Sequence, residues 1–350
     1  MFNYEYVGNL HIHSLHSDGG ATTEEIARKA AATGLDFICL NDHAHMADAL
    51  HLDEEGYYGK LLVMVGLEIG VRYHHYLAYD IHDKPSRHNL NAQETIDWVN
   101  SRGGFGFMAH PFEKGMPFTE KSIAYTWNDL SVTGYSGVCI WNFTSRWKER
   151  VKTVLHGLFF LAFKTQTLRG PSPETLSFWD QESRNKRVVA VGGSDAHGTV
   201  FKWGSLCLTP FSYNYLLHSI NIHVLLKNKL SSAFSEAKQE IYEAMRNGRL
   251  FVAHENLSSA KGFRFDFLCS DGSDLFMGEE APFMPGQFVV ESPEEGNIRL
   301  IKDGVLMEER LGKEAIFSVA EKGVYRVEVY KHLFLFGWRP WIFSNPIYLR

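Results

Sequence analysis

The stretch that decides the fold is Asn9-Leu10-His11-Ile12-His13-Ser14-Leu15-His16-Ser17-Asp18-Gly19-Gly20. It begins as a β-strand, in which successive side chains point to opposite faces, so His11 and His13 share one face while Leu10 and Ile12 pack on the other. The turn residues that follow can bring the carboxylate of Asp18 back toward the two imidazoles. Two imidazoles on one face provide half of a metal site.

The same pattern recurs along the chain, because several short apolar strands end directly in a polar side chain. These strand-end residues are His43, Glu68, His110, Asn142, Asp195 and His197. Helical segments lie between the strands, with capping boxes that begin at Thr22 and at Asn91. Apolar strands that alternate with helices indicate a parallel sheet that is covered on both faces. Reactive polar side chains at the carboxyl ends of so many strands favour a barrel over an open sheet.

Beyond about residue 256 the pattern changes to short alternating runs at 297–301, 315–319 and 325–330, separated by turn residues. No helical period is present there. We therefore predict two domains: an α/β barrel over residues 1–255, and a small all-β, sandwich-like domain over residues 256–350 with a supporting role.

Composition narrows the class of protein. The chain has 350 residues, 45% of them hydrophobic, and a formal net charge of -6. This excludes a disordered protein and argues against general binding to nucleic acid or to an anionic membrane. The N-terminus lacks the features of a signal peptide, and the longest apolar run, 158–163, is too short to cross a bilayer. We predict a cytoplasmic protein whose partner is a small anionic ester; the oligomeric state stays open.

The residues at the strand ends fit a metal-dependent hydrolase, which needs imidazoles and carboxylates aimed at one point. The set offers only nitrogen and oxygen, which suits manganese, iron or zinc. Each motif also has a structural reading: Asp42-His43 as a helix cap, Glu68 as a surface charge, and His110-Pro111 as a turn. Several independent strand ends that each supply a ligand favour the metal site.

The order of the motifs resembles the PHP (polymerase and histidinol phosphatase) superfamily. The motifs are His-Ile-His-Ser-Leu-His-Ser-Asp-Gly at 11–19, Asn-Asp-His at 41–43, Gly-Leu-Glu at 66–68, Ala-His-Pro at 109–111 and Gly-Ser-Asp-Ala-His at 193–197. This resemblance covers about residues 5–255. The first block, residues 192–197 and the closing stretch 341–348 resemble the CehA/McbA-like metallohydrolase branch.

The resemblance implies a distorted (β/α)7, TIM-like barrel with two or three divalent metal ions (Mn, Fe or Zn) at its mouth. The implied ligands are His11, His13, Glu68 and Asp195 for the first metal; Glu68, His110 and His75 for the second; and Asp18, His43 and His197 for the third. His75 is chosen over its neighbour because the family places this ligand just ahead of an apolar strand. His74 remains an alternative.

The predicted function is hydrolysis of a phosphoester by a hydroxide that bridges two metals, with Glu68, Asp195 and His197 as catalytic residues. The candidate substrate-binding residues are Asn142, Lys114, Arg146 and His16. A helix cap for Asn142 and solvated surface charges for Lys114 and Arg146 remain alternatives. A carboxyl ester, carbamate or amide hydrolase is the second reading. A metal-binding module without turnover is the third.

Overall fold

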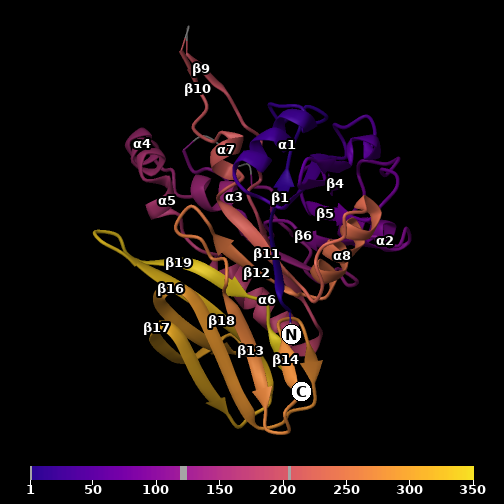
Figure 1. Cartoon of the computed structure of the whole chain (residues 1–350). Helices are drawn as coiled ribbons and strands as arrows, with labels where there is room; N and C mark the ends of the chain where they lie inside the picture. The colour runs from indigo at the N-terminus through magenta and orange to yellow at the C-terminus, as the bar shows by residue number, and fades with distance from the viewer. Residues whose placement is uncertain (1, 119–123, 204–205) are drawn as a thin grey trace.

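Seven strands form a ring in the first part of the fold in this computed structural model, which describes residues 2–118, 124–203 and 206–350 (Figure 1). In the order in which they pair, the strands are β1 (Tyr4–Ile12), β2 (Phe37–His43), β4 (Leu61–Ile69), β5 (Tyr76–Tyr79), β6 (Phe105–Met108), β7 (Gly137–Asn142) and β8 (Val189–Gly193). Neighbouring strands run parallel except at β5, which is antiparallel to both β4 and β6.

The segment that follows β8 returns to β1 and closes the ring of strands. The amide of Ser194 donates to the carbonyl of Leu10 at 3.2 Å, and the amide of His13 donates to the carbonyl of Ala196 at 2.9 Å. The two backbones meet at Gly193, where a Cβ atom would lie 2.6 Å from the carbonyl oxygen of Leu10. Only glycine permits this close approach of the two backbones, which explains the glycine at position 193 of the block 192–197.

Helices begin where the sequence predicts. Both capping boxes are present, at Thr22 before α1 (Thr23–Ala32) and at Asn91 before α2 (Ala92–Asn100). Ser172 caps α6 (Pro173–Asn185) with proline at the first helical position. The remaining elements of this part are η1 (Leu52–Glu54), β3 (Gly56–Tyr58), α3 (Phe143–Lys148), α4 (Val154–Ala162), α5 (Lys164–Thr167), β9 (Phe201–Trp203), β10 (Leu206–Leu208), α7 (Tyr213–Leu216), β11 (Ile220–Leu226), α8 (Phe234–Arg246) and β12 (Leu250–His254).

The mixed α/β character of this part is confirmed, but strands and helices do not alternate regularly. Residues 70–75 alone connect β4 to β5. A parallel crossover needs a dozen residues or more, so this short connection makes β5 antiparallel. None of the helices among the described residues is long and apolar enough to cross a bilayer.

The C-terminal part is β-rich, as predicted. Its strands are β13 (Arg264–Cys269), β14 (Asp274–Phe276), β15 (Glu280–Ala281), β16 (Gly286–Lys302), β17 (Val305–Val319), β18 (Gly323–Leu333), β19 (Gly337–Ser344) and β20 (Ile347–Leu349). The long β16 pairs with β13, β17 and β18. These strands bury a second core that includes Phe265, Phe288 and Trp341.

The two parts share one sheet, because β19 pairs with β12 and places Phe343 opposite Val252. Asn345 strengthens this joint: its Oδ1 accepts from the amide of Ala190 at 2.7 Å, and its Nδ2 donates to the carbonyls of Ala190 and Leu250. The closing stretch 341–348 therefore ties the β-rich part to β8 and β12. The predicted boundary at residues 255/256 stays a prediction, and the sheet runs across it.

Candidate metal centre

The carboxyl ends of the ring strands carry side chains that meet at one place. In the pairing of β2 with β4, His43 lies directly opposite Glu68. The nine predicted ligands fall into four overlapping groups, within each of which the ligand atoms lie within 4.8 Å of one another. These groups are His13–Asp18–His43–His197, His11–His110–Asp195, His11–His13–Glu68 and His43–Glu68–His75.

The implied ligands of the first metal have the spacing of a filled coordination shell. His11 Nε2 lies 3.1 Å from Glu68 Oε1 and 3.4 Å from Asp195 Oδ1, and His13 Nε2 lies 3.5 Å from Glu68 Oε2. Ligands of a tetrahedral zinc ion are about 3.3 Å apart. The Nε2 atoms of both imidazoles are buried and have no hydrogen-bond partner among the described residues. These residues therefore fit a divalent metal.

Glu68 lies at the centre of the cluster and is almost completely buried. Its Oε1 is 2.8 Å from His75 Nδ1 and 3.3 Å from His110 Nε2, whereas its Oε2 is 3.0 Å from His43 Nδ1. The two oxygens thus face different imidazoles, which is the arrangement that a carboxylate needs to bridge two metals.

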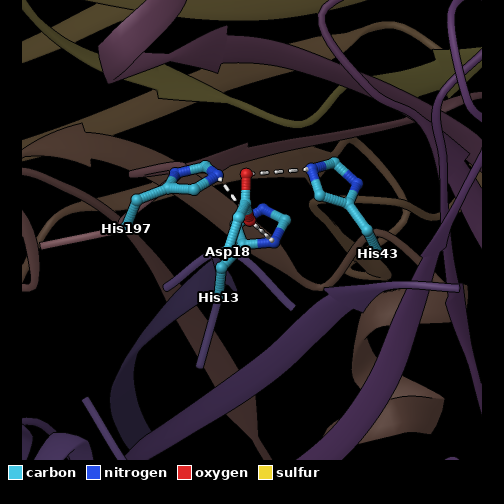
Figure 2. A group of neighbouring side chains, drawn as sticks. All are labelled: His13, Asp18, His43 and His197. Carbon is cyan, nitrogen blue, oxygen red and sulfur yellow. Dashed lines mark ion pairs between the residues drawn. The ribbon is translucent and has the colours of Figure 1, made fainter. Parts of the chain in front are cut away.

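Asp18 brings together the implied ligands of the third metal. Figure 2 shows its carboxylate between the imidazoles of His43 and His197. Asp18 Oδ1 lies 3.3 Å from His197 Nε2, and Oδ2 lies 3.8 Å from His43 Nε2. His13 Nδ1 is 3.7 Å from Asp18 Oδ1, so this imidazole presents one nitrogen to each side of the cluster.

Burial and the dense charges of the cluster shift the pKa values in opposite directions. Burial alone would raise the pKa of Glu68, but the imidazoles of His11, His75 and His43 hold it well below its usual range. Burial lowers the pKa of His43 to about 3. Burial would also lower the pKa of His197, but hydrogen bonding to Asp18 raises it to about 9. Ionised carboxylates and a neutral His43 are the protonation states that bind metal ions.

Three of the predicted ligands have a left-handed backbone conformation, which residues other than glycine rarely adopt. The φ angles of His11, His110 and Asp195 are 63°, 29° and 54°. These three residues form one of the four groups. Such strain persists where the surrounding structure enforces it, and it concentrates at functional sites.

Two neighbours that the sequence analysis did not select hold the loop that carries Asp18. Asp42 accepts hydrogen bonds from the amide and the hydroxyl of Ser14, each at 2.7 Å. The Tyr213 hydroxyl donates to the carbonyl of His13 at 2.6 Å and accepts from the amide of Gly20 at 3.1 Å. Asp42 directly precedes the predicted ligand His43, and this position could have identified it from the sequence. The sequence around Tyr213 contains no comparable signal for that residue.

The structure distinguishes His75 from His74. His75 is buried against Glu68, whereas the ring of His74 packs edge-on against Trp127 at 5.2 Å, and His74 belongs to none of the metal-capable groups found among the described residues. We expect His75→Ala to lose about one metal ion per chain, since the second site would lose one of its three protein ligands. His74→Ala, the matched control, should keep the full complement. Elemental analysis of the two purified proteins measures the difference; equal metal content would contradict the assignment.

The four predicted substrate-binding residues do not line the cavity at the metal centre. Asn142 caps α3 by accepting from the amide of Ser145, and its Nδ2 donates to Asp195 Oδ2 at 3.3 Å. It therefore orients a predicted ligand.

The other three are engaged elsewhere. Lys114 pairs with Glu174 at 2.7 Å, and Arg146 pairs with Glu149. His16 Nε2 lies 3.0 Å from Glu54 Oε1, and its ring stacks on that of His51. Direct contact of these three residues with a substrate in the cavity stays a prediction without support from their positions.

A cavity of about 280 Å³ opens over the cluster. Besides the predicted ligands, its lining includes Glu113, Tyr125, Thr144 and Lys148. Lys148 lies on α3 with its Nζ 2.8 Å from Glu113 Oε1, and Glu113 is buried. The sequence analysis missed these residues. The position of Glu113 three residues after His110 was the available signal for one of them.

Comparison with known proteins finds similarity over part of the chain. The sequence model of the PHP domain matches residues 9–134. No curated protein sequence matches the chain significantly. A two-domain protein from Bacteroides vulgatus ATCC 8482, described as containing a predicted PHP-like metal-dependent phosphoesterase, is similar at a TM-score of 0.49 and 14% identity, over 98% of this chain and 95% of that one. PsfC from Pseudomonas syringae PB-5123 is similar at a TM-score of 0.38 and 13% identity, over 68% of this chain and 88% of that one.

The matched segment runs from β1 into the loop after β6. It contains seven of the nine predicted ligands: His11, His13, Asp18, His43, Glu68, His75 and His110. Membership of the CehA/McbA-like branch stays a prediction. The family match and the convergence of these side chains agree, and the chain is similar to the PHP domain family over residues 9–134.

Proposed function

We propose that the chain is a metal-dependent hydrolase that cleaves a small anionic phosphoester with two or three divalent ions of manganese, iron or zinc. One observation carries the proposal: nitrogen and oxygen ligands from several strand ends surround Glu68, whose two oxygens face different imidazoles. The PHP domain supports the same class of reaction. The cavity of about 280 Å³ suits a small substrate.

Divalent ions bound by these residues would supply Lewis acidity, which makes water a better nucleophile at neutral pH and stabilises negative charge on the ester. The side chains of the protein would hold the metal ions and the substrate in place. Glu68 and Asp195 hold ionised carboxylates among the imidazoles, and Asn142 fixes one oxygen of Asp195. Lys148 places an ammonium group in the lining of the cavity, where it can bind an anionic group of the substrate.

The proposal predicts turnover of p-nitrophenyl phosphate, with manganese, zinc or iron added, in preference to p-nitrophenyl acetate or a carbamate. Lys148→Met should raise KM for the phosphate roughly tenfold, with a smaller change in kcat, because a charge-assisted hydrogen bond is worth about 1.5–3 kcal/mol. Lys114→Met is the matched control, since this lysine lies outside the cavity and pairs with Glu174. Steady-state kinetics on both esters measure these effects.

Two results would contradict the proposal. Turnover of the carbonyl esters alone would favour the carboxyl ester, carbamate or amide hydrolase. A protein with stoichiometric metal but no turnover of either ester class would favour the metal-binding module without catalysis.

A further inference from the structure

The most apolar helix of the chain is exposed. α4 has the sequence Val154-Leu-His-Gly-Leu-Phe-Phe-Leu-Ala162, and none of these residues, all of which the structure describes, is buried. Leu155 is 76% exposed and Leu158 is 60% exposed. A short apolar helix in a folded protein normally packs into the core, and an exposed apolar surface of this kind marks an interaction site.

A second apolar element lies beside the end of this helix. Phe334 and Leu335, at the tip of the hairpin between β18 and β19, are each 86% exposed. The rings of Phe336 and Phe163 are 5.5 Å apart, which joins the hairpin tip to the residue that follows α4. Figure 1 shows the helix and the hairpin tip projecting on the same side of the molecule. We call the exposed residues of these two elements the apolar patch: Val154, Leu155, Leu158, Phe159, Phe163, Phe334 and Leu335.

Positive charge borders the apolar patch. The guanidinium of Arg150 lies 4.0 Å from the centre of the Phe160 ring on α4. Burial, together with the nearby charges of Arg169 and Arg339, lowers the pKa of Arg150 to about 10. The Nε of Arg339 is buried and has no hydrogen-bond partner among the described residues.

These three arginines lack a carboxylate in ion-pair contact among the described residues, and the carboxylate near Arg150, that of Glu149, pairs with Arg146. Within residues 2–118, 124–203 and 206–350, Arg150, Arg169 and Arg339 form no ion pair with a carboxylate. Lys152 and Lys164 add a cation at each end of α4. Like charges gathered without a counter-ion indicate that the partner of this surface is anionic.

We propose that the apolar patch docks on an anionic phospholipid bilayer. An apolar helix flanked by cations lies in the plane of a membrane surface, with its hydrophobic side chains at the acyl boundary and its basic side chains at the level of the phosphates. α4 is much too short to span the bilayer, so it would rest on the surface. The net charge of -6 argues against attraction of the whole protein to an anionic membrane, but it permits binding through this local cluster, because screening limits the interaction to nearby charges.

The same charges argue against a second copy of the chain as the partner. A two-fold symmetric dimer through this face would bring the two arginine clusters together, and their repulsion would oppose association. A bilayer that contains anionic lipid covers the apolar side chains and also neutralises the arginines. Because α3 lines the cavity and leads directly into α4, docking on a membrane would hold one wall of the cavity near the lipid.

Sedimentation of the full chain with lipid vesicles tests the proposal. The wild-type protein should bind vesicles of equal parts phosphatidylcholine and phosphatidylglycerol, and added salt should weaken this binding. The double variant Leu155→Glu/Leu158→Glu should bind at least about tenfold more weakly, since two leucines leave the acyl boundary. Arg169→Glu should also weaken binding and reduce its salt dependence. Leu311→Glu is the matched control, because Leu311 is 73% exposed but lies on β17, and it should bind like the wild type.

Circular dichroism spectra establish that each variant is folded before binding is compared. The proposal fails if the wild-type protein ignores the anionic vesicles, or if it binds vesicles of phosphatidylcholine alone equally well. It also fails if the double variant binds like the wild type. A wild-type dimer in light scattering that the double variant dissociates would show that a second copy covers the patch.

Discussion

Replacing Glu68 with glutamine should remove bound metal and hydrolytic activity together. The neutral amide keeps the size of the side chain but loses the charge that both oxygens present to the imidazoles of His11, His43 and His75. We expect kcat/KM for a phosphoester to fall by at least about a thousandfold, since metal Lewis acidity contributes several kcal/mol to catalysis. Elemental analysis and phosphatase assays of the same preparation measure both losses.

Glu255→Gln is the matched control for this substitution. Glu255 is also a buried carboxylate beside an imidazole, with its Oε1 3.1 Å from His223 Nε2, but it lies outside the cavity and belongs to none of the metal-capable groups among the described residues. This variant should keep its metal. A Glu68→Gln protein with the metal content and the activity of the wild type would show that Glu68 does not bridge metal ions.

Replacing Arg326 with methionine should lower the free energy of unfolding by about 3–5 kcal/mol, because it leaves two carboxylates without their partner. Arg326 is buried on β18, and it pairs with both oxygens of Asp180 on α6, at 2.7 and 2.9 Å. Its Nη1 also lies 2.6 Å from Glu328 Oε1. The arginine thus joins the β-rich part to a helix of the first part. Urea unfolding measures the loss.

Arg299→Met provides the comparison. Arg299 pairs with Glu309 on the surface of the β-rich part, where both side chains are partly exposed. Such pairs contribute about 0–1 kcal/mol, so the unfolding midpoint should move little. Equal midpoint shifts for the two variants would refute a special role for the buried pair. Arg326→Lys should recover only part of the stability, because lysine cannot reproduce the two-point contact with Asp180.

The sequence predicted which side chains gather at the candidate metal centre, because strand geometry determines where they lie. The alternation of side chains determines that His11 and His13 share a face, and the parallel pairing of β2 with β4 brings His43 level with Glu68. The helix caps were also readable, since Thr22 and Asn91 each stand three residues before a glutamate with which they exchange hydrogen bonds. Local rules govern all of these features.

Features that depend on tertiary packing were not predicted. The sequence did not point to Lys148, because the direction of this side chain depends on the short helix α3 and on its buried partner Glu113. His16 follows the end of β1, where the alternation of faces no longer applies. The exposure of α4 also contradicts the usual behaviour of an apolar run, and only the arrangement of the whole chain reveals it.

The pairing of β12 with β19 gives the C-terminal part a protective role. A chain that ended at residue 255 would leave one edge of β12 with unsatisfied amides and carbonyls, and an open edge of this kind recruits other chains into aggregates. It would also remove the two hydrogen bonds between Ala190 and Asn345, and Ala190 lies on β8, the strand that leads to Asp195. The β-rich part therefore covers an edge of the sheet that carries the candidate metal centre, and its removal would expose that edge to pairing with other chains.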